Sequence, residues 1–160
     1  RKTCFPTYST KFFTLRSSLF IYFVLLHKIQ FIMDNRVTYW TEMSDYDLET
    51  AEAMLATGRY LYVAFMCHQT IEKILKAYWT LHLEEVPMKI HSLFRLAEKT
   101  GLDKDFTEEQ LDFIDTLEPL NIEARYPSYK ERLLKSLNRE YCDRLLQQTK
   151  ELQLWIKNKL

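Results

Sequence analysis

Glycine and proline are scarce in this chain, which has two glycines and four prolines in 160 residues. Strand-rich folds need these residues at their many tight turns, so the shortage excludes a sheet-based fold and favours long helices with short connections. Hydrophobic residues make up 47% of the chain and aromatic residues 14%, a composition that excludes disorder throughout. At this length we expect one all-α domain.

Cysteine is also rare and has no metal-site spacing. The three cysteines, Cys4, Cys67 and Cys142, are an odd number without a CxxC pair. Neither a disulfide framework nor a zinc site is predicted, and a reducing cytoplasm is the expected location. The sequence has no glycine-rich phosphate loop, nucleophile motif or metal-ligand cluster, so we expect no cofactor and no metal.

Acidic residues are missing from residues 1–33, which contain five basic residues. The remainder has 17 basic and 22 acidic residues, a net charge of about −5. Proteins that bind nucleic acid without sequence preference normally carry a basic surface. Any contact of the acidic remainder with RNA is therefore expected to be local.

The N-terminal 32 residues are predicted to be an extension, either read-through or disordered, ahead of a helical domain at 33–160. Their apolar run at residues 19–26 is short for a transmembrane helix and ends at His27 and Lys28. No small-residue cleavage site of a secretory signal precedes Asp34. A membrane anchor is the alternative, but no membrane partner is expected.

Apolar positions that recur every three or four residues predict five helices. The predicted helices cover residues 38–57, 59–85, 91–101, 107–119 and 128–160. The second is apolar almost all round in its first half, which predicts a central position. Short connections predict an antiparallel up-down bundle of four to five helices, two of them long and central.

Capping residues mark several of these helix ends. Gly58 and Gly101 are expected to end the first and third helices. Two capping boxes are predicted at helix starts, and they pair Thr107 with Gln110 and Ser128 with Glu131.

One polar strip is predicted on the second helix. The residues His68, Gln69, Glu72, Lys73 and Lys76 lie at offsets of one, four, five and eight. On an α-helix these offsets fall along one narrow face. The strip is the first candidate for a ligand-binding surface.

Three short motifs then follow in order: HQTIEKILKA at residues 68–77, IHSL at 90–93 and EARYP at 123–127. With the preceding Gly58-Arg-Tyr60, this ordered set resembles the HEPN family over about residues 38–157. The resemblance implies a bundle of four or five helices, usually a homodimer. It also implies a minimal nucleotidyltransferase as partner, in a pair that resembles a toxin–antitoxin system.

Other members of that family are metal-independent ribonucleases, which use an arginine and a histidine four to six residues apart. This chain departs from that spacing, because eight residues separate Arg59 from His68 and ten separate Arg16 from His27. The chemistry needs an acid–base group beside a cation. A ribonuclease would therefore have to assemble its pair from distant positions, for example His91 with Arg125.

Arg125 and Tyr126 are candidates for binding a nucleotide, since they lie between Pro119 and Pro127. A planar guanidinium suits a phosphate, and a tyrosine can stack on a base or donate a hydrogen bond. The alternative is structural: Arg125 pairs with a carboxylate such as Glu72, and Tyr126 packs in the core.

The second wall of a phosphate site would come from Lys73, Lys76 and Glu72. The alternative is that these three residues form an ordinary solvated charge pattern on the helix surface. His91 near a helix start either contacts the ligand or caps the helix. His68 is expected to be a satisfied core or dimer-interface histidine.

The leading prediction is a dimeric, non-catalytic HEPN-like module that binds a nucleotide or phosphate around Arg125, Lys73 and Lys76 and partners a nucleotidyltransferase. The first alternative is a metal-independent ribonuclease toxin that uses His91 and Arg125. The second alternative is a helical adaptor with no small ligand.

Overall fold

The computed structural model describes residues 10–83, 85–123 and 136–160, and in this part of the chain every regular element is a helix. The all-α prediction is therefore confirmed. The elements are α1 (Thr10–Ala56), α2 (Tyr60–Leu83), α3 (Leu93–Thr100), the 3₁₀-helix η1 (Leu102–Asp105), α4 (Glu108–Leu117), α5 (Leu120–Glu123) and α7 (Arg139–Lys157). None of the described helices is both long enough and apolar enough to cross a lipid bilayer.

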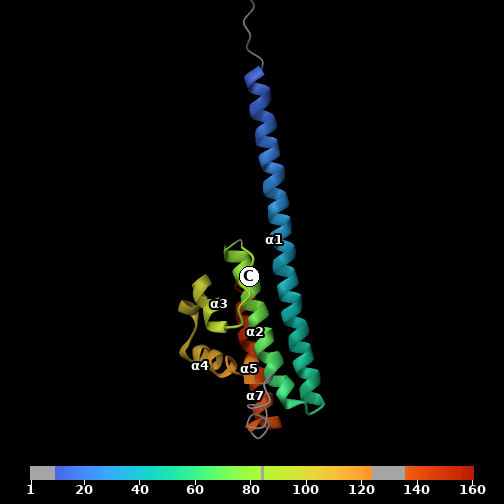
Figure 1. The fold of residues 1–160 in the computed structure, drawn as a ribbon, viewed down its shortest axis with the longest axis vertical. Helices are drawn as coiled ribbons and strands as arrows, with labels where there is room; N and C mark the ends of the chain where they lie inside the picture. Colours follow the sequence, from blue (N-terminus) through green and yellow to red (C-terminus); the bar gives the residue numbers. More distant parts are fainter. Residues whose placement is uncertain (1–9, 84, 124–135) are drawn as a thin grey trace, which may run out of the picture.

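Helices α1 and α2 form an antiparallel hairpin (Figure 1). Gly58 closes it with a φ of 70°, a left-handed conformation that glycine adopts without steric cost. Helix α1 begins at Thr10 rather than at residue 38, because no glycine or proline interrupts residues 7–57. The division of the chain at residue 33 stays a prediction.

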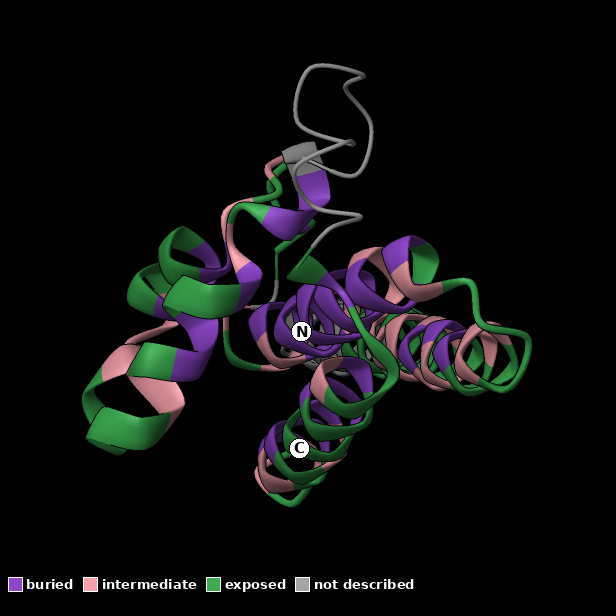
Figure 2. Ribbon diagram, turned by 90° about the horizontal axis from the view of Figure 1, so that it is seen from below, coloured by how far each residue is buried: buried purple, intermediate pink, exposed green. Residues whose placement is uncertain are grey.

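Helix α2 lies at the centre, as its all-round apolar pattern predicted. It packs against α1, α7, α3, α4 and α5. Figure 2 shows buried residues along this central helix and on the inward faces of its neighbours. Fifteen side chains between Leu61 and Thr80 on α2, including Ile71, Ile74 and Leu75, are buried. This burial provides the main hydrophobic stabilisation of the bundle.

The short helices α3, η1, α4 and α5 lie together on one side of α2 (Figure 1). Gly101 ends α3 with a φ of 75°, as predicted. The capping box at the start of α4 is also confirmed, since Thr107 and Gln110 exchange side-chain to backbone hydrogen bonds of 3.0 and 3.2 Å. These caps set where α3 ends and where α4 begins.

The predicted last helix is not continuous. Leu137 and Asn138 are not helical, and α7 begins at Arg139. The Asn138 side chain caps it by accepting a hydrogen bond from Tyr141 N at 2.8 Å. An asparagine that offers its oxygen to the backbone favours a helix start over a helix interior. The predicted capping box of Ser128 and Glu131 lies outside the described residues.

Candidate functional site

A buried carboxylate on α2 organises the candidate site. The Glu72 side chain is 1% exposed. Its Oε1 accepts a hydrogen bond from Lys76 Nζ at 2.6 Å, and its Oε2 accepts one from His91 Nδ1 at 3.0 Å. Gln69 Nε2 donates to Oε2 at a longer 3.5 Å. The polar strip predicted on this helix is thus a connected cluster.

Opposing effects set the ionisation of Glu72. Burial alone would raise the pKa of its carboxyl, but the hydrogen bonds from Lys76 and His91 outweigh burial and hold the pKa below its usual value. Glu72 is therefore a carboxylate near neutral pH, and a carboxylate can only accept hydrogen bonds.

His91 consequently presents one ring nitrogen to the protein and the other to solvent. Since Glu72 accepts, His91 Nδ1 carries the shared proton, and Nε2 makes no hydrogen bond with the described residues; the side chain is 56% exposed. The interpretation of His91 as a capping residue is wrong. Ser92 is the N-cap of α3, and its Oγ accepts a hydrogen bond from Arg95 N at 3.3 Å.

The two lysines of the strip are bound inside the bundle. Lys76 is 8% exposed and lies 5.4 Å from the ring centre of Trp40, in addition to its pairing with Glu72. Lys73 Nζ donates to Gln69 Oε1 at 2.8 Å and lies 3.8 Å from Asp47 Oδ2. Lys76 is therefore not part of an ordinary solvated charge pattern. Its charge is compensated by Glu72.

A hollow of about 480 Å³ opens beside His91. It is lined by His91, Ser92, Asp115, Glu118, Pro119 and Asn121. Glu118 Oε2 accepts a hydrogen bond from Leu93 N at 2.8 Å, which joins the end of α4 to the start of α3. Asn121 is 4% exposed, and its Oδ1 has no hydrogen-bond partner within the described part of the chain.

The structure unites some of the predicted site residues. Glu72, Lys76 and His91 are in direct contact, and Lys73 is bound on the adjoining turn. Arg125 and Tyr126 lie outside the described residues, so their predicted roles stay predictions.

Of the residues that line the hollow, sequence reasoning selected only His91 and missed Ser92, Asp115, Glu118, Pro119 and Asn121. A partial signal was present, because Asp115 and Glu118 are three residues apart on α4 and precede Pro119. Residues at that spacing share one face at the end of a helix, beside the next turn of chain.

His68 is completely buried near the same carboxylate. Its Nδ1 lies 3.9 Å from Glu72 Oε2 and 3.4 Å from Gln69 Nε2, whereas its Nε2 has no hydrogen-bond partner among the described residues. Burial lowers the pKa of His68 to about 4, and attraction to Glu72 opposes that shift. His68 is thus a neutral core residue.

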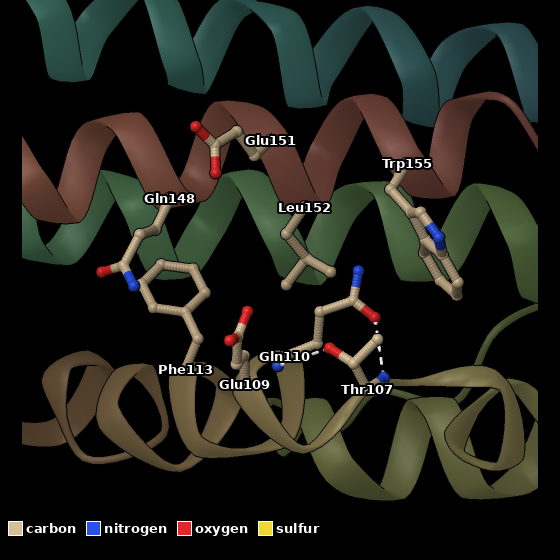
Figure 3. A pocket seen from close by; sticks show the side chains of 8 residues that line it. All are labelled: Thr107, Glu109, Gln110, Phe113, Gln148, Glu151, Leu152 and Trp155. Atoms are coloured by element: carbon tan, nitrogen blue, oxygen red, sulfur yellow. Dashed lines mark hydrogen bonds between the residues drawn. The ribbon is translucent and has the colours of Figure 1, made fainter.

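A second hollow of about 400 Å³ lies between α4 and α7 (Figure 3). Phe113, Leu152 and Trp155 form its apolar part, and Glu109 and Glu151 are its charged residues. Figure 3 shows Thr107 and Gln110 bonded to each other there as the capping box of α4. It contains none of the predicted site residues, so the hollow beside His91 remains the candidate site.

No group of three or more histidine, cysteine or acidic side chains is arranged to hold a metal ion in the described ranges 10–83, 85–123 and 136–160.

Replacing Glu72 with glutamine is predicted to lower the free energy of unfolding by about 3 kcal/mol, because the buried Lys76 ammonium loses its counter-charge. The double variant Glu72→Gln/Lys76→Met should recover most of this loss, as measured by urea denaturation. Glu140→Gln is a matched control in an exposed pair with Arg144 and should change stability by less than about 0.5 kcal/mol. Equal losses for Glu72→Gln and Glu140→Gln would contradict the central role of Glu72.

His68 is predicted to make the fold sensitive to acid. The unfolded chain takes up a proton on this histidine near pH 6.5, whereas the folded chain does so near pH 4. The free energy of unfolding therefore falls by about 3 kcal/mol through this group as the pH drops across that interval. Above pH 6.5 the contribution is complete.

Urea denaturation at pH 7 and pH 4 should show a smaller pH dependence for His68→Gln than for the wild type. His82→Gln, which changes an exposed histidine of the same helix, should keep the wild-type dependence. An unchanged pH dependence in His68→Gln would show that other groups cause the acid sensitivity.

Comparison with known proteins identifies the family. The model of the HEPN domain matches residues 37–159. The crystal structure of TT1696 from Thermus thermophilus is similar, with a TM-score of 0.66 and 24% identity over 79% of this chain and 99% of that chain. ST0689, an archaeal HEPN homologue, is similar with a TM-score of 0.55 and 19% identity over 77% of this chain and 96% of that chain.

At these identities the two structures establish a shared fold. The comparison with curated proteins gave no match. The family match spans most of the chain and agrees with the helical bundle. This chain therefore belongs to the HEPN domain family.

Proposed function

We propose that this chain is a nucleotide-binding HEPN module that acts as a dimer beside a minimal nucleotidyltransferase, in a toxin–antitoxin-like pair. The observation that carries the binding proposal is His91, whose Nδ1 is fixed by the buried Glu72 while the remainder of its ring borders an open hollow. A histidine held in this way is preorganised for a ligand. The dimer, the partner and a cytoplasmic location rest on the family and on the composition.

The hollow has the size of a small-molecule site, since such sites have volumes of about 300–1,000 Å³. His91 can offer its free nitrogen to a bound nucleotide as donor or acceptor, depending on its protonation. Lys73 and Lys76 are engaged inside the bundle, so they would act by fixing Glu72 and the surrounding turn. In this proposal the phosphate contacts come from Arg125, and Tyr126 stacks on the base.

The binding function predicts that AMP or GMP binds the purified chain in isothermal titration calorimetry. His91→Ala and Arg125→Ala should each weaken binding about tenfold or more, which corresponds to the loss of one charge-assisted hydrogen bond. His82→Ala should bind like the wild type, since His82 stacks on Tyr78 away from the hollow. Absence of nucleotide binding in the wild type would reject the proposal.

A second function, metal-independent RNA cleavage, is favoured by one observation. A buried carboxylate that holds one nitrogen of a histidine leaves the other nitrogen free to take a proton from a nucleophile. In this mechanism His91 Nε2 would accept the proton of a ribose 2′-hydroxyl, and Arg125 would stabilise the negative charge that develops on the phosphate.

RNA incubated with the chain and a metal chelator separates the two functions. The binding module predicts intact RNA with the wild type and with every variant. Cleavage by the wild type that is lost in both His91→Ala and Glu72→Gln, but kept in His82→Ala, would instead establish the ribonuclease. Gel electrophoresis gives the extent of cleavage, and circular dichroism checks that each variant is folded.

A further inference from the structure

The outer side of α1 carries a regular row of mostly apolar side chains. From Leu25 to Tyr46 the row advances by alternating steps of four and three residues. Its members are Leu25, Ile29, Ile32, Arg36, Tyr39, Met43 and Tyr46. Steps of four and three keep all of these residues on one narrow stripe of the helix, which is the pattern of a coiled-coil seam. We call this stripe the outer row.

The outer row is exposed to solvent. Leu25, Ile29, Tyr39 and Tyr46 are each more than half exposed, and Ile32 is 44% exposed. Exposed apolar side chains are ordinary when they are scattered singly, but a continuous apolar stripe in water is unfavourable and marks an interaction surface. The regular spacing indicates that the missing partner is another helix, because only a helix presents side chains at matching intervals along such a seam.

Helices α2 and α7 occupy other sides of α1, so they leave the outer row free. Ser44 Oγ donates a hydrogen bond to Thr70 O on α2 at 2.8 Å. Lys150 Nζ on α7 pairs with Glu52 Oε1 at 2.6 Å. Neither Ser44 nor Glu52 belongs to the outer row. A further helix can therefore reach the outer row without displacing either neighbour.

The charge beside the outer row changes sign along α1. Lys28, Glu42 and Glu49 are separated by multiples of seven residues, so they lie along the same flank of the row. None of the three makes an ion pair with another described residue. The first half of this flank is therefore basic and the second half is acidic. Such a helix complements a copy of itself when the copy runs in the opposite direction.

We infer that the outer row binds the outer row of a second copy of this chain in an antiparallel coiled coil. In this pairing the first half of each α1 lies along the second half of the other. Ile32 then meets Met43 of the second copy, and Lys28 lies beside Glu49 of the second copy. The inference rests on the dimer of the proposed function, to which it assigns an interface.

Arg36 decides between the two possible directions. In a parallel pair each seam residue meets its own equivalent, so two Arg36 side chains would face each other at the centre of the seam, where like charges repel. In the antiparallel pair Arg36 instead meets Tyr39 of the second copy, and a guanidinium is attracted to the face of an aromatic ring. The antiparallel pair also has a two-fold axis, so the assembly closes at two chains.

The test measures the mass and the dissociation constant of the full chain by sedimentation equilibrium. The wild type should have the mass of two chains. Ile32→Glu should raise the dissociation constant about a hundredfold, because the two-fold axis buries the new charge twice. Phe31→Glu adds the same charge one residue away, at a position that is 66% exposed and outside the outer row, and should dimerise like the wild type within threefold. Circular dichroism checks that both variants are folded.

A charge swap tests the direction of the pair. Lys28→Glu and Glu49→Lys should each weaken the dimer about fivefold, since the axis repeats every charge contact, and the double variant should return to the wild-type affinity within twofold. The two positions are about 30 Å apart along one helix, so they do not meet within a single chain. Rescue in the double variant therefore requires a second copy that runs in the opposite direction.

The possible failures are distinguishable. A wild-type dimer that Ile32→Glu leaves unchanged would overturn this inference alone, because another surface would then hold the two chains together. Absence of rescue by the double charge swap would overturn the antiparallel arrangement, and a mass that grows beyond two chains would overturn the closed pair. A wild type with the mass of one chain would reject both the inference and the proposed dimer, whereas nucleotide binding is decided separately by calorimetry.

Discussion

The charge of Glu72 is the constraint on which the centre of this bundle depends. A carboxylate that is 1% exposed loses almost all of its hydration, and folding is favourable only if donors replace that water. Lys76 from the next turn of α2 and His91 from the chain before α3 supply them. The hydrogen bond from His91 to the ionised Glu72 thus helps to hold α3 beside α2, in addition to apolar packing.

This arrangement also changes the chemical character of the polar strip. Lys73 and Lys76 are bound to groups of the protein, and His91 contacts both the buried Glu72 and the neighbouring hollow. The two lysines that suggested a phosphate site in the sequence are therefore already paired within the protein.

The sequence allowed the helical elements to be predicted where local chemistry decides them. The central position of α2, the left-handed Gly101 and the capping box at Thr107 all follow from residue periodicity and backbone capping. The start of α1 and the break that precedes α7 were missed. No glycine or proline between residues 10 and 38 marks where α1 begins, and Asn138 caps α7 within the stretch that the apolar pattern predicted as one helix.

The sequence allowed several residues of the candidate site to be selected, but it did not predict which of them contact one another. A Glu72–Lys76 spacing of four is typical of exposed helical pairs, so its burial could not be read from the spacing. The contact between Glu72 and His91 joins residues 19 positions apart, and the hollow adds residues from α4 and α5. Such contacts depend on how helices pack, which no local pattern specifies.

Helix α1 extends well past the other helices at its N-terminal end (Figure 1). With a rise of 1.5 Å per residue, residues 10–28 add about 30 Å to one end of the molecule. An elongated particle has a larger frictional coefficient than a sphere of equal mass. Gel filtration will consequently overstate the mass of this protein, so a single chain can elute like a compact dimer, whereas light scattering measures mass independently of shape.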